Sequence, residues 1–201
     1  MYYRIAVSSL VVLVLGGAAL TGAAAVSAQQ ADAFARKLAI IAQQGSLAPR
    51  AAGARRTAVT EAEVNSWFAY RAQQLLPEGM TGPQVTIVGD GKVTGAATVD
   101  LEAIGRSRRS GSVIDPWSLL GGRLPVTVTG ILRTSNGQGR FELEHAAVSS
   151  VPIPKALLQE LVSHYSRTAD DPGGISLDEP FELPANIRQI EVGQGQAVVV
   201  Q

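Results

Sequence analysis

The strongest constraint on the fold is a series of six strand-like segments joined in pairs by short glycine-rich turns, and apolar and polar residues alternate most clearly in 124–132 and 140–148. The pairs are 84–88 with 92–101, 124–132 with 140–148, and 187–192 with 196–201. Alternation with a period of two gives a strand one apolar and one polar face, and Gly or Asn-Gly between two such strands favours a hairpin. The pattern therefore predicts an antiparallel sheet with one buried face.

Two amphipathic helices interrupt the strand pattern. The first begins at a capping box, Thr60 with Glu63 three residues later, and ends before Pro77. The second covers residues 155–165. We therefore predict an α+β fold, in which a twisted antiparallel sheet of about six strands is rolled around one long and one shorter amphipathic helix. These elements form a single domain over residues 59–201.

The first 28 residues have the pattern of a secretory signal peptide. Arg4 precedes an apolar run over residues 5–20, and Val26-Ser27-Ala28 supplies the small residues of a cleavage site. An uncleaved membrane anchor is the alternative, but the apolar run is short for a bilayer crossing. The sequence thus predicts export to the periplasm or the extracellular space, with residues 1–28 removed. Residues 29–58 are rich in Ala, Gln and Arg, which predicts a flexible, partly helical tether.

Charge and residue types exclude several functions. The chain has 17 basic and 17 acidic residues, so it lacks the excess positive charge of a nucleic-acid-binding protein. It has no cysteine, which removes disulfides, thiol catalysis and cysteine metal sites. The sequence contains no hydrolase elbow, zinc-protease motif or phosphate-binding loop. We therefore expect no enzyme activity, no cofactor and no metal.

Two groups of residues leave alternatives open. His145 and His164 are the only histidines, and each is expected on or beside an apolar face, which favours a structural role over that of a general base. The loop at 166–180 is acidic, and a Ca²⁺ site is the alternative to a solvated loop. Its carboxylates do not follow the order of an EF-hand, so the solvated loop is favoured; they are Asp170, Asp171, Asp178 and Glu179.

The segment 102–123 interrupts the strands and combines cationic with apolar residues. Asp115 and Pro116 predict the start of one helical turn. The segment fits either a lid that contacts a lipid surface or a plug that covers the open end of the sheet. Its arginines are Arg106, Arg108 and Arg109, and its large apolar residues are Trp117, Leu119 and Leu120.

Arg71 is unusual because the helical wheel places it inside the apolar stripe of the first helix. An unpaired guanidinium in that position is costly, so it requires a carboxylate, backbone oxygens or a ligand anion. An internal ion pair or exposure of the charged end of the side chain is the favoured interpretation. A contact with a lipid head group is the functional alternative.

Three short motifs resemble those of a known group of proteins. They are Thr-Glu-Ala-Glu-Val-Asn at 60–65, Val-Pro-Ile-Pro at 151–154, and Pro-Phe-Glu-Leu-Pro-Ala-Asn-Ile-Arg-Gln-Ile-Glu-Val-Gly-Gln-Gly at 180–195. Together they resemble exported bacterial proteins of the LmeA-like and YceB-like type, within the tubular lipid-binding (TULIP) superfamily. The resemblance covers about residues 58–201 and implies a long curved sheet around a helix, enclosing an apolar groove for acyl chains. It implies no catalytic residues.

The leading hypothesis is an exported, non-catalytic cell-envelope protein that binds a phospholipid or another amphiphile and contacts the membrane surface. Head groups would meet Arg71 and the arginines at 106, 108 and 109. An envelope protein-interaction or assembly module with a solid core, and hence a protein partner, is the alternative; a hydrolase using His145 or His164 is the least favoured. The apolar groove would be lined by Val64, Trp67, Phe68, Leu75, Trp117, Leu119, Leu120, Leu158 and Leu161.

Overall fold

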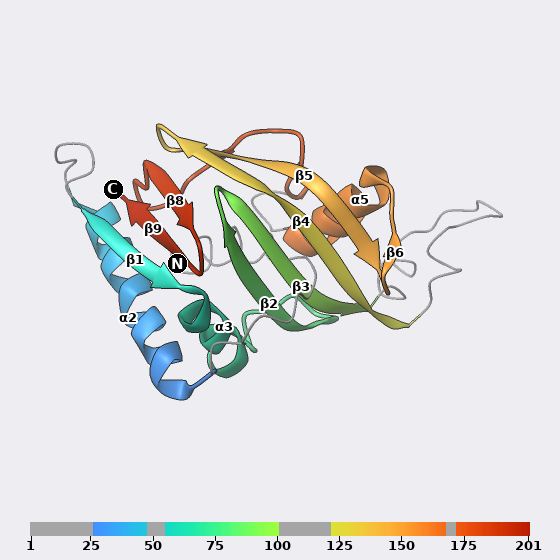
Figure 1. Ribbon diagram of the computed structural model, residues 1–201, viewed down its shortest axis with the longest axis horizontal. Helices are drawn as coiled ribbons and strands as arrows, with labels where there is room; N and C mark the ends of the chain where they lie inside the picture. Colours follow the sequence, from blue (N-terminus) through green and yellow to red (C-terminus); the bar gives the residue numbers. More distant parts are fainter. Residues whose placement is uncertain (1–25, 48–54, 101–121, 168–171) are drawn as a thin grey trace.

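A computed structural model describes residues 26–47, 55–100, 122–167 and 172–201. These residues form an α+β structure with three helices, a six-stranded antiparallel sheet and a three-stranded antiparallel sheet. Figure 1 shows the smaller sheet at one end of the molecule beside two helices, and the third helix against the larger sheet. The predicted α+β class and antiparallel sheet are therefore confirmed.

The N-terminal part of the described chain is a pair of helices, α2 (Ala28–Gly45) and α3 (Glu61–Tyr70). The capping box predicted at the start of α3 is present. The Thr60 hydroxyl accepts a hydrogen bond from the Glu63 amide at 3.2 Å, and the Glu63 carboxylate accepts one from the Thr60 amide at 2.9 Å. Helix α3 is shorter than expected and ends at Tyr70 rather than before Pro77.

Helix α2 confirms that part of 29–58 is helical but corrects the expectation that this part is a flexible tether. It has 18 residues and buries Ala31, Phe34 and Ile41, so the helix belongs to the folded core. The three buried positions are separated by three and seven residues, the spacing that places side chains on one helix face. Alanine and glutamine fill most of the remaining positions, which makes the apolar stripe narrow and hard to detect in the sequence.

The larger sheet has the strand order β2-β3-β4-β5-β6, and β7 pairs with β5. Its hairpins turn where the sequence predicts them: Asp90 and Gly91 have φ values of 53° and 81°, and Asn136 and Gly137 have values of 50° and 81°. Two successive positive φ values are typical of the tight turns that match strand twist. The strands are β2 (Met80–Gly89), β3 (Lys92–Asp100), β4 (Arg123–Ser135), β5 (Gln138–Val148), β6 (Val151–Pro152) and β7 (Phe181–Glu182).

The smaller sheet has the order β1-β9-β8 and was not expected as a separate sheet. Strands β8 (Gln189–Gly193) and β9 (Gln196–Val200) form the predicted C-terminal hairpin. Strand β1 (Arg56–Thr60) lies in the segment assigned to the tether, and it pairs with β9 along its whole length, from Arg56 opposite Val200 to Thr60 opposite Gln196. A strand that follows α2 therefore pairs with the last strand of the described chain.

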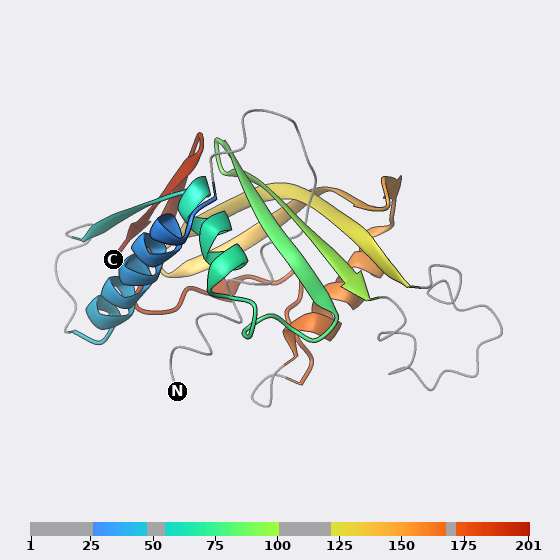
Figure 2. The same cartoon turned by 90° about the horizontal axis from the view of Figure 1, so that it is seen from below.

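One continuous group of buried side chains connects both sheets and all three helices. Phe34 of α2 and Trp67 of α3 belong to the same buried cluster as Val126 of β4 and Leu158 of α5 (Lys155–Ser166). Figure 2 shows α5 lying along the larger sheet, well separated from α2. The inward strand positions are mostly Val and Ala, for example Val126 opposite Val148 and Val128 opposite Ala146, so the helices supply the bulky residues of the core.

Candidate functional site

Two of the aromatic residues expected to line a groove, Trp67 and Phe68, lie in the core. Trp67 and Phe68 are each 2% exposed. The Phe34 ring contacts Trp67 edge to face, with 5.8 Å between ring centroids, and Phe68 packs on Trp67 at 5.5 Å. Phe34 comes from α2, which the sequence analysis had assigned to a tether. Helix α2 therefore occupies space beside Trp67.

The other predicted lining residues are spread over different environments. Leu158 and Leu161 of α5 are completely buried in the same cluster as Trp67. Val64 is partly buried and packs against that cluster, whereas Leu75 lies beyond the end of α3 and is exposed. Trp117, Leu119 and Leu120, together with Arg106, Arg108 and Arg109, lie outside the described residues.

Arg71 does not lie on an apolar helix face. Helix α3 ends at Tyr70, so Arg71 is its C-cap, with φ −126° and ψ −28°, and the helical wheel no longer applies to it. Its side chain is 52% exposed and forms an ion pair with Asp32 of α2. Of the three partners considered for this guanidinium, the protein provides a carboxylate, and the ion pair lies on the surface rather than in the interior. Surface ion pairs of this kind contribute about 0–1 kcal/mol.

The two histidines differ in their burial and in their contacts. His164 packs edge to face on Tyr165, with 5.1 Å between ring centroids, and burial followed by the nearby charge of Arg167 lowers its pKa. His145 is exposed, contrary to the expected apolar position. A register shift between Thr129 and Gly130 explains this, because it turns His145 to the opposite face from Leu143.

The described ranges contain no group of three His, Asp or Glu side chains close enough to hold a metal ion.

Tyr165 has a structural role: its hydroxyl donates to the Asp100 carbonyl oxygen at 3.0 Å. Burial, assisted by the Asp100 charge, raises the pKa of Tyr165 to about 12, so this phenol remains a hydrogen-bond donor in the folded protein.

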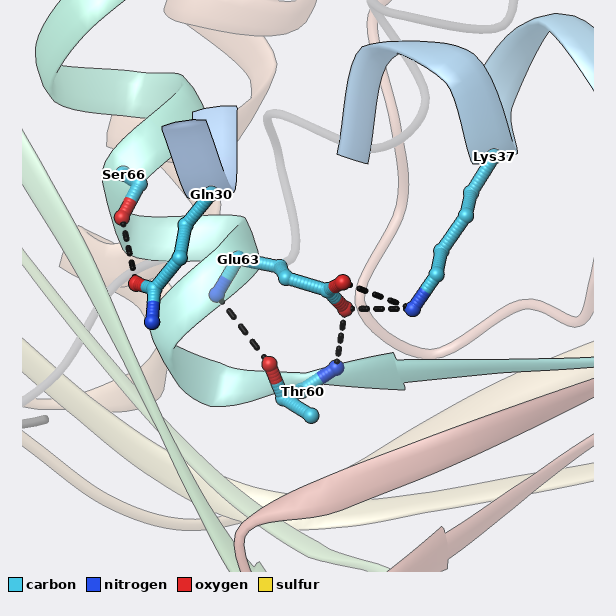
Figure 3. Close-up of polar contacts among 5 residues, drawn as sticks. All are labelled: Gln30, Lys37, Thr60, Glu63 and Ser66. Atoms are coloured by element: carbon cyan, nitrogen blue, oxygen red, sulfur yellow. Dashed lines mark hydrogen bonds and ion pairs between the residues drawn. The ribbon is translucent and has the colours of Figure 1, made fainter. Parts of the chain in front are cut away.

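A polar junction attaches α2 to α3 (Figure 3). Lys37 Nζ lies 2.7 Å from both carboxylate oxygens of Glu63, and Ser66 donates to Gln30 Oε1 at 3.1 Å. Burial alone would raise the pKa of Glu63, but hydrogen bonds from Lys37 and Thr60 outweigh it and hold this pKa below its ordinary value. Glu63 therefore serves the capping box and the helix pair at once.

A cavity of about 350 Å³ lies where the end of α2 meets the β4–β5 turn, the segment before β8 and the last residue of the chain. Among the described residues, its lining combines apolar side chains, amides and two arginines and includes no Asp or Glu. No local pattern in the sequence indicates it, because five separate segments contribute. The lining residues are Gln44, Leu47, Arg55, Asn136, Gly137, Leu183, Asn186, Ile187, Arg188 and Gln201.

The two arginines of this cavity differ in how they are held. Arg55 donates from Nη1 to the carbonyl oxygen of Gln44, at the C-terminal end of α2, at 3.1 Å. Arg188 is exposed and makes no ion pair or side-chain hydrogen bond with another residue in the described part of the chain. One guanidinium is therefore anchored, and the other is free to bind an anion.

The amides of the cavity hold its walls in place. Asn186 Nδ2 donates to the Gly45 carbonyl oxygen at 2.6 Å, and Gln201 Nε2 donates to the carbonyl oxygens of Ile41 at 3.0 Å and Ala185 at 2.6 Å. Two buried side-chain oxygens in the described residues have no hydrogen-bond partner, Gln44 Oε1 and Gln201 Oε1. Both belong to residues of this cavity wall. Buried acceptors without partners are rare in folded proteins and are often found at sites that bind water or a ligand.

Within the described residues, no helix has the length and apolar character needed to cross a membrane. Comparison of the chain with protein-family models, with curated proteins and with solved structures gave no match.

Proposed function

We propose that this chain is an exported, non-catalytic binding protein of the cell envelope that holds an anionic amphiphile in the cavity at the end of α2. The observation that carries the proposal is the presence of two arginines, Arg55 and Arg188, in a lining whose described residues include no Asp or Glu side chain. The larger sheet would roll around α3 and α5, as the expected lipid-binding architecture requires. The proposed ligand is an amphiphile, as in the leading hypothesis from the sequence, but the proposed binding site is this cavity and not the apolar face of α3.

The chemistry of the lining fits a head group better than a long acyl chain. A guanidinium is planar and always charged, and it binds phosphate or carboxylate oxygens through two parallel hydrogen bonds. Leu47, Leu183 and Ile187 offer apolar surface beside the arginines. Each methylene buried there would add about 0.8 kcal/mol of affinity. The volume lies at the low end of ligand cavities, so the ligand would be small or only partly enclosed.

The test measures binding of two water-soluble short-chain lipids to the exported chain purified from cells. Dihexanoyl phosphatidylglycerol is the anionic probe, and dihexanoyl phosphatidylcholine is its neutral counterpart. We expect the anionic lipid to bind more tightly and Arg188→Gln to weaken it about tenfold, the loss of one charged contact. Arg123→Gln, an exposed change at the opposite end of β4, is the matched control.

Native mass spectrometry and isothermal titration provide the readouts. Equal binding of the two lipids, no binding of either, or equal effects of the Arg188 and Arg123 variants would each contradict the proposal. Thermal unfolding of both variants shows whether a change in binding reflects a change in folding.

The packing favours a second candidate, an envelope protein-interaction module. Its supporting observation is the continuous core that encloses Trp67 and Phe68, together with the edge position of β1, which pairs with β9 alone among the described strands. An edge strand offers backbone groups to an added strand of a partner. A photo-crosslinking residue at exposed Ala58 should capture one envelope protein in cells, whereas the same residue at Arg140 of β5 should not. If no protein is crosslinked at Ala58, this candidate is excluded.

A further inference from the structure

Ser27 is an integral part of the folded domain. It is the N-cap of α2: its hydroxyl accepts a hydrogen bond from the Gln30 amide at 3.3 Å, and its carbonyl oxygen accepts one from the Ala31 amide at 3.1 Å. Its own amide donates to Ser66 Oγ at 3.1 Å. Ser66 is completely buried in α3 and donates in turn to Gln30 Oε1, the contact drawn in Figure 3. The start of α2 is thus fixed to α3 through Ser27.

A cut after Ala28 would remove this anchor. The first turn of α2 would lose its cap, and the buried Ser66 hydroxyl would lose a hydrogen-bond donor. The new terminal ammonium would lie on Gln29, at the positive end of the helix dipole, where a cation is unfavourable. The small residues Val26-Ser27-Ala28 therefore look like a cleavage site in the sequence but serve as a helix start in the structure.

A second set of small residues lies directly upstream. Ala23-Ala24-Ala25 has the Ala-x-Ala pattern of a signal-peptidase site. A cut after Ala25 would leave Val26, which is 45% exposed, as the first residue and would keep every hydrogen bond of Ser27. We propose that the leader is removed between Ala25 and Val26, so that the mature chain keeps Ser27 as the cap of α2. This cleavage site would be used if the chain is exported, whether or not the protein binds a ligand.

The experiment uses the full precursor, expressed with a C-terminal tag in an exporting bacterium. Intact-mass measurement and N-terminal sequencing of the purified protein identify the first residue. We expect Val26. A protein that starts at Gln29, one that starts elsewhere, or one that remains uncut would overturn the proposal.

Two variants locate the cut independently. Ala25→Leu places a bulky residue where the peptidase needs a small one, and we expect uncut precursor to accumulate. Ala28→Leu is the control, because Ala28 is exposed and its replacement leaves the upstream site intact, so processing should continue. The opposite pattern would place the cut after Ala28.

A chain made to start at Gln29 should also melt about 2–4 °C below one that starts at Val26, because it lacks the cap. Equal melting temperatures would contradict the role given to Ser27.

Discussion

Replacing Phe34 by alanine tests whether α2 belongs to the folded domain. The ring is 3% exposed and packs edge to face on Trp67, with an interplanar angle of 74°. If residues 29–58 were a tether, this change would leave stability unchanged. In the structure described above it opens a cavity between α2 and α3.

The expected loss is a large part of the stability of the domain. Truncation of a buried phenylalanine to alanine costs about 3–5 kcal/mol, and an aromatic pair contributes about 0.5–1.5 kcal/mol of such a loss beyond area burial. Domains of this size unfold with about 5–15 kcal/mol. With a slope of about 2 kcal/mol per M urea, the midpoint should fall by about 1.5–2.5 M.

Urea unfolding of the purified protein, followed by tryptophan fluorescence and far-ultraviolet circular dichroism, measures this shift. Ile40→Ala is the matched control, because Ile40 lies on the same helix and is 45% exposed. It should change the free energy of unfolding by less than about 0.5 kcal/mol. Equal midpoints for the wild type and the Phe34 variant would refute the packing of α2 on Trp67.

Replacing Glu63 by glutamine removes an ion pair to α2 and should cost about 1 kcal/mol at pH 7. Because the pKa of folded Glu63 lies below its ordinary value of 4.5, the deficit is complete above pH 4.5 and disappears as pH falls through the folded-state pKa. Urea unfolding from pH 7 to pH 2 checks this sign; a deficit that stays constant would contradict it. Replacing Gly130 by alanine places a Cβ 2.5 Å from the Glu142 carbonyl oxygen and against the Phe141 ring, so stability should fall by about 1–3 kcal/mol. Gly193→Ala, whose Cβ meets only ordinary contacts, is the control in thermal unfolding, and equal shifts for the two variants would exclude the steric explanation.

Features determined by neighbouring residues could be predicted from the sequence. The capping box of Thr60 and Glu63 and the turn at Asn136-Gly137 depend on a few adjacent side chains and on positive φ values, and both are present. Helix α5 spans nearly the predicted residues, because Pro154 precedes its first turn and its apolar residues follow a helical period. The α+β class follows from these local elements.

Features determined by distant residues could not be predicted. Strand β1 has five residues, and its partner β9 is the last described strand and distant in sequence, so the sequence of β1 carries no pairing signal. The wheel that placed Arg71 on an apolar face assumed a helix that continued, whereas α3 ends one residue earlier. The bulge beside Gly130 turned His145 outward, and the cavity near Arg188 depends on the packing of five segments.

The central position of β9 affects how the polypeptide is made. Residues 56–60 have no strand partner in the described chain except 196–200, which are synthesised after all the other described strands. The entropy of closing that long loop is lost before any of the new contacts form. A nascent chain that has not yet reached Gln196 therefore lacks the smaller sheet. A ribosome stalled before Gln196 would hold α2 and α3 without the strand that completes their surroundings.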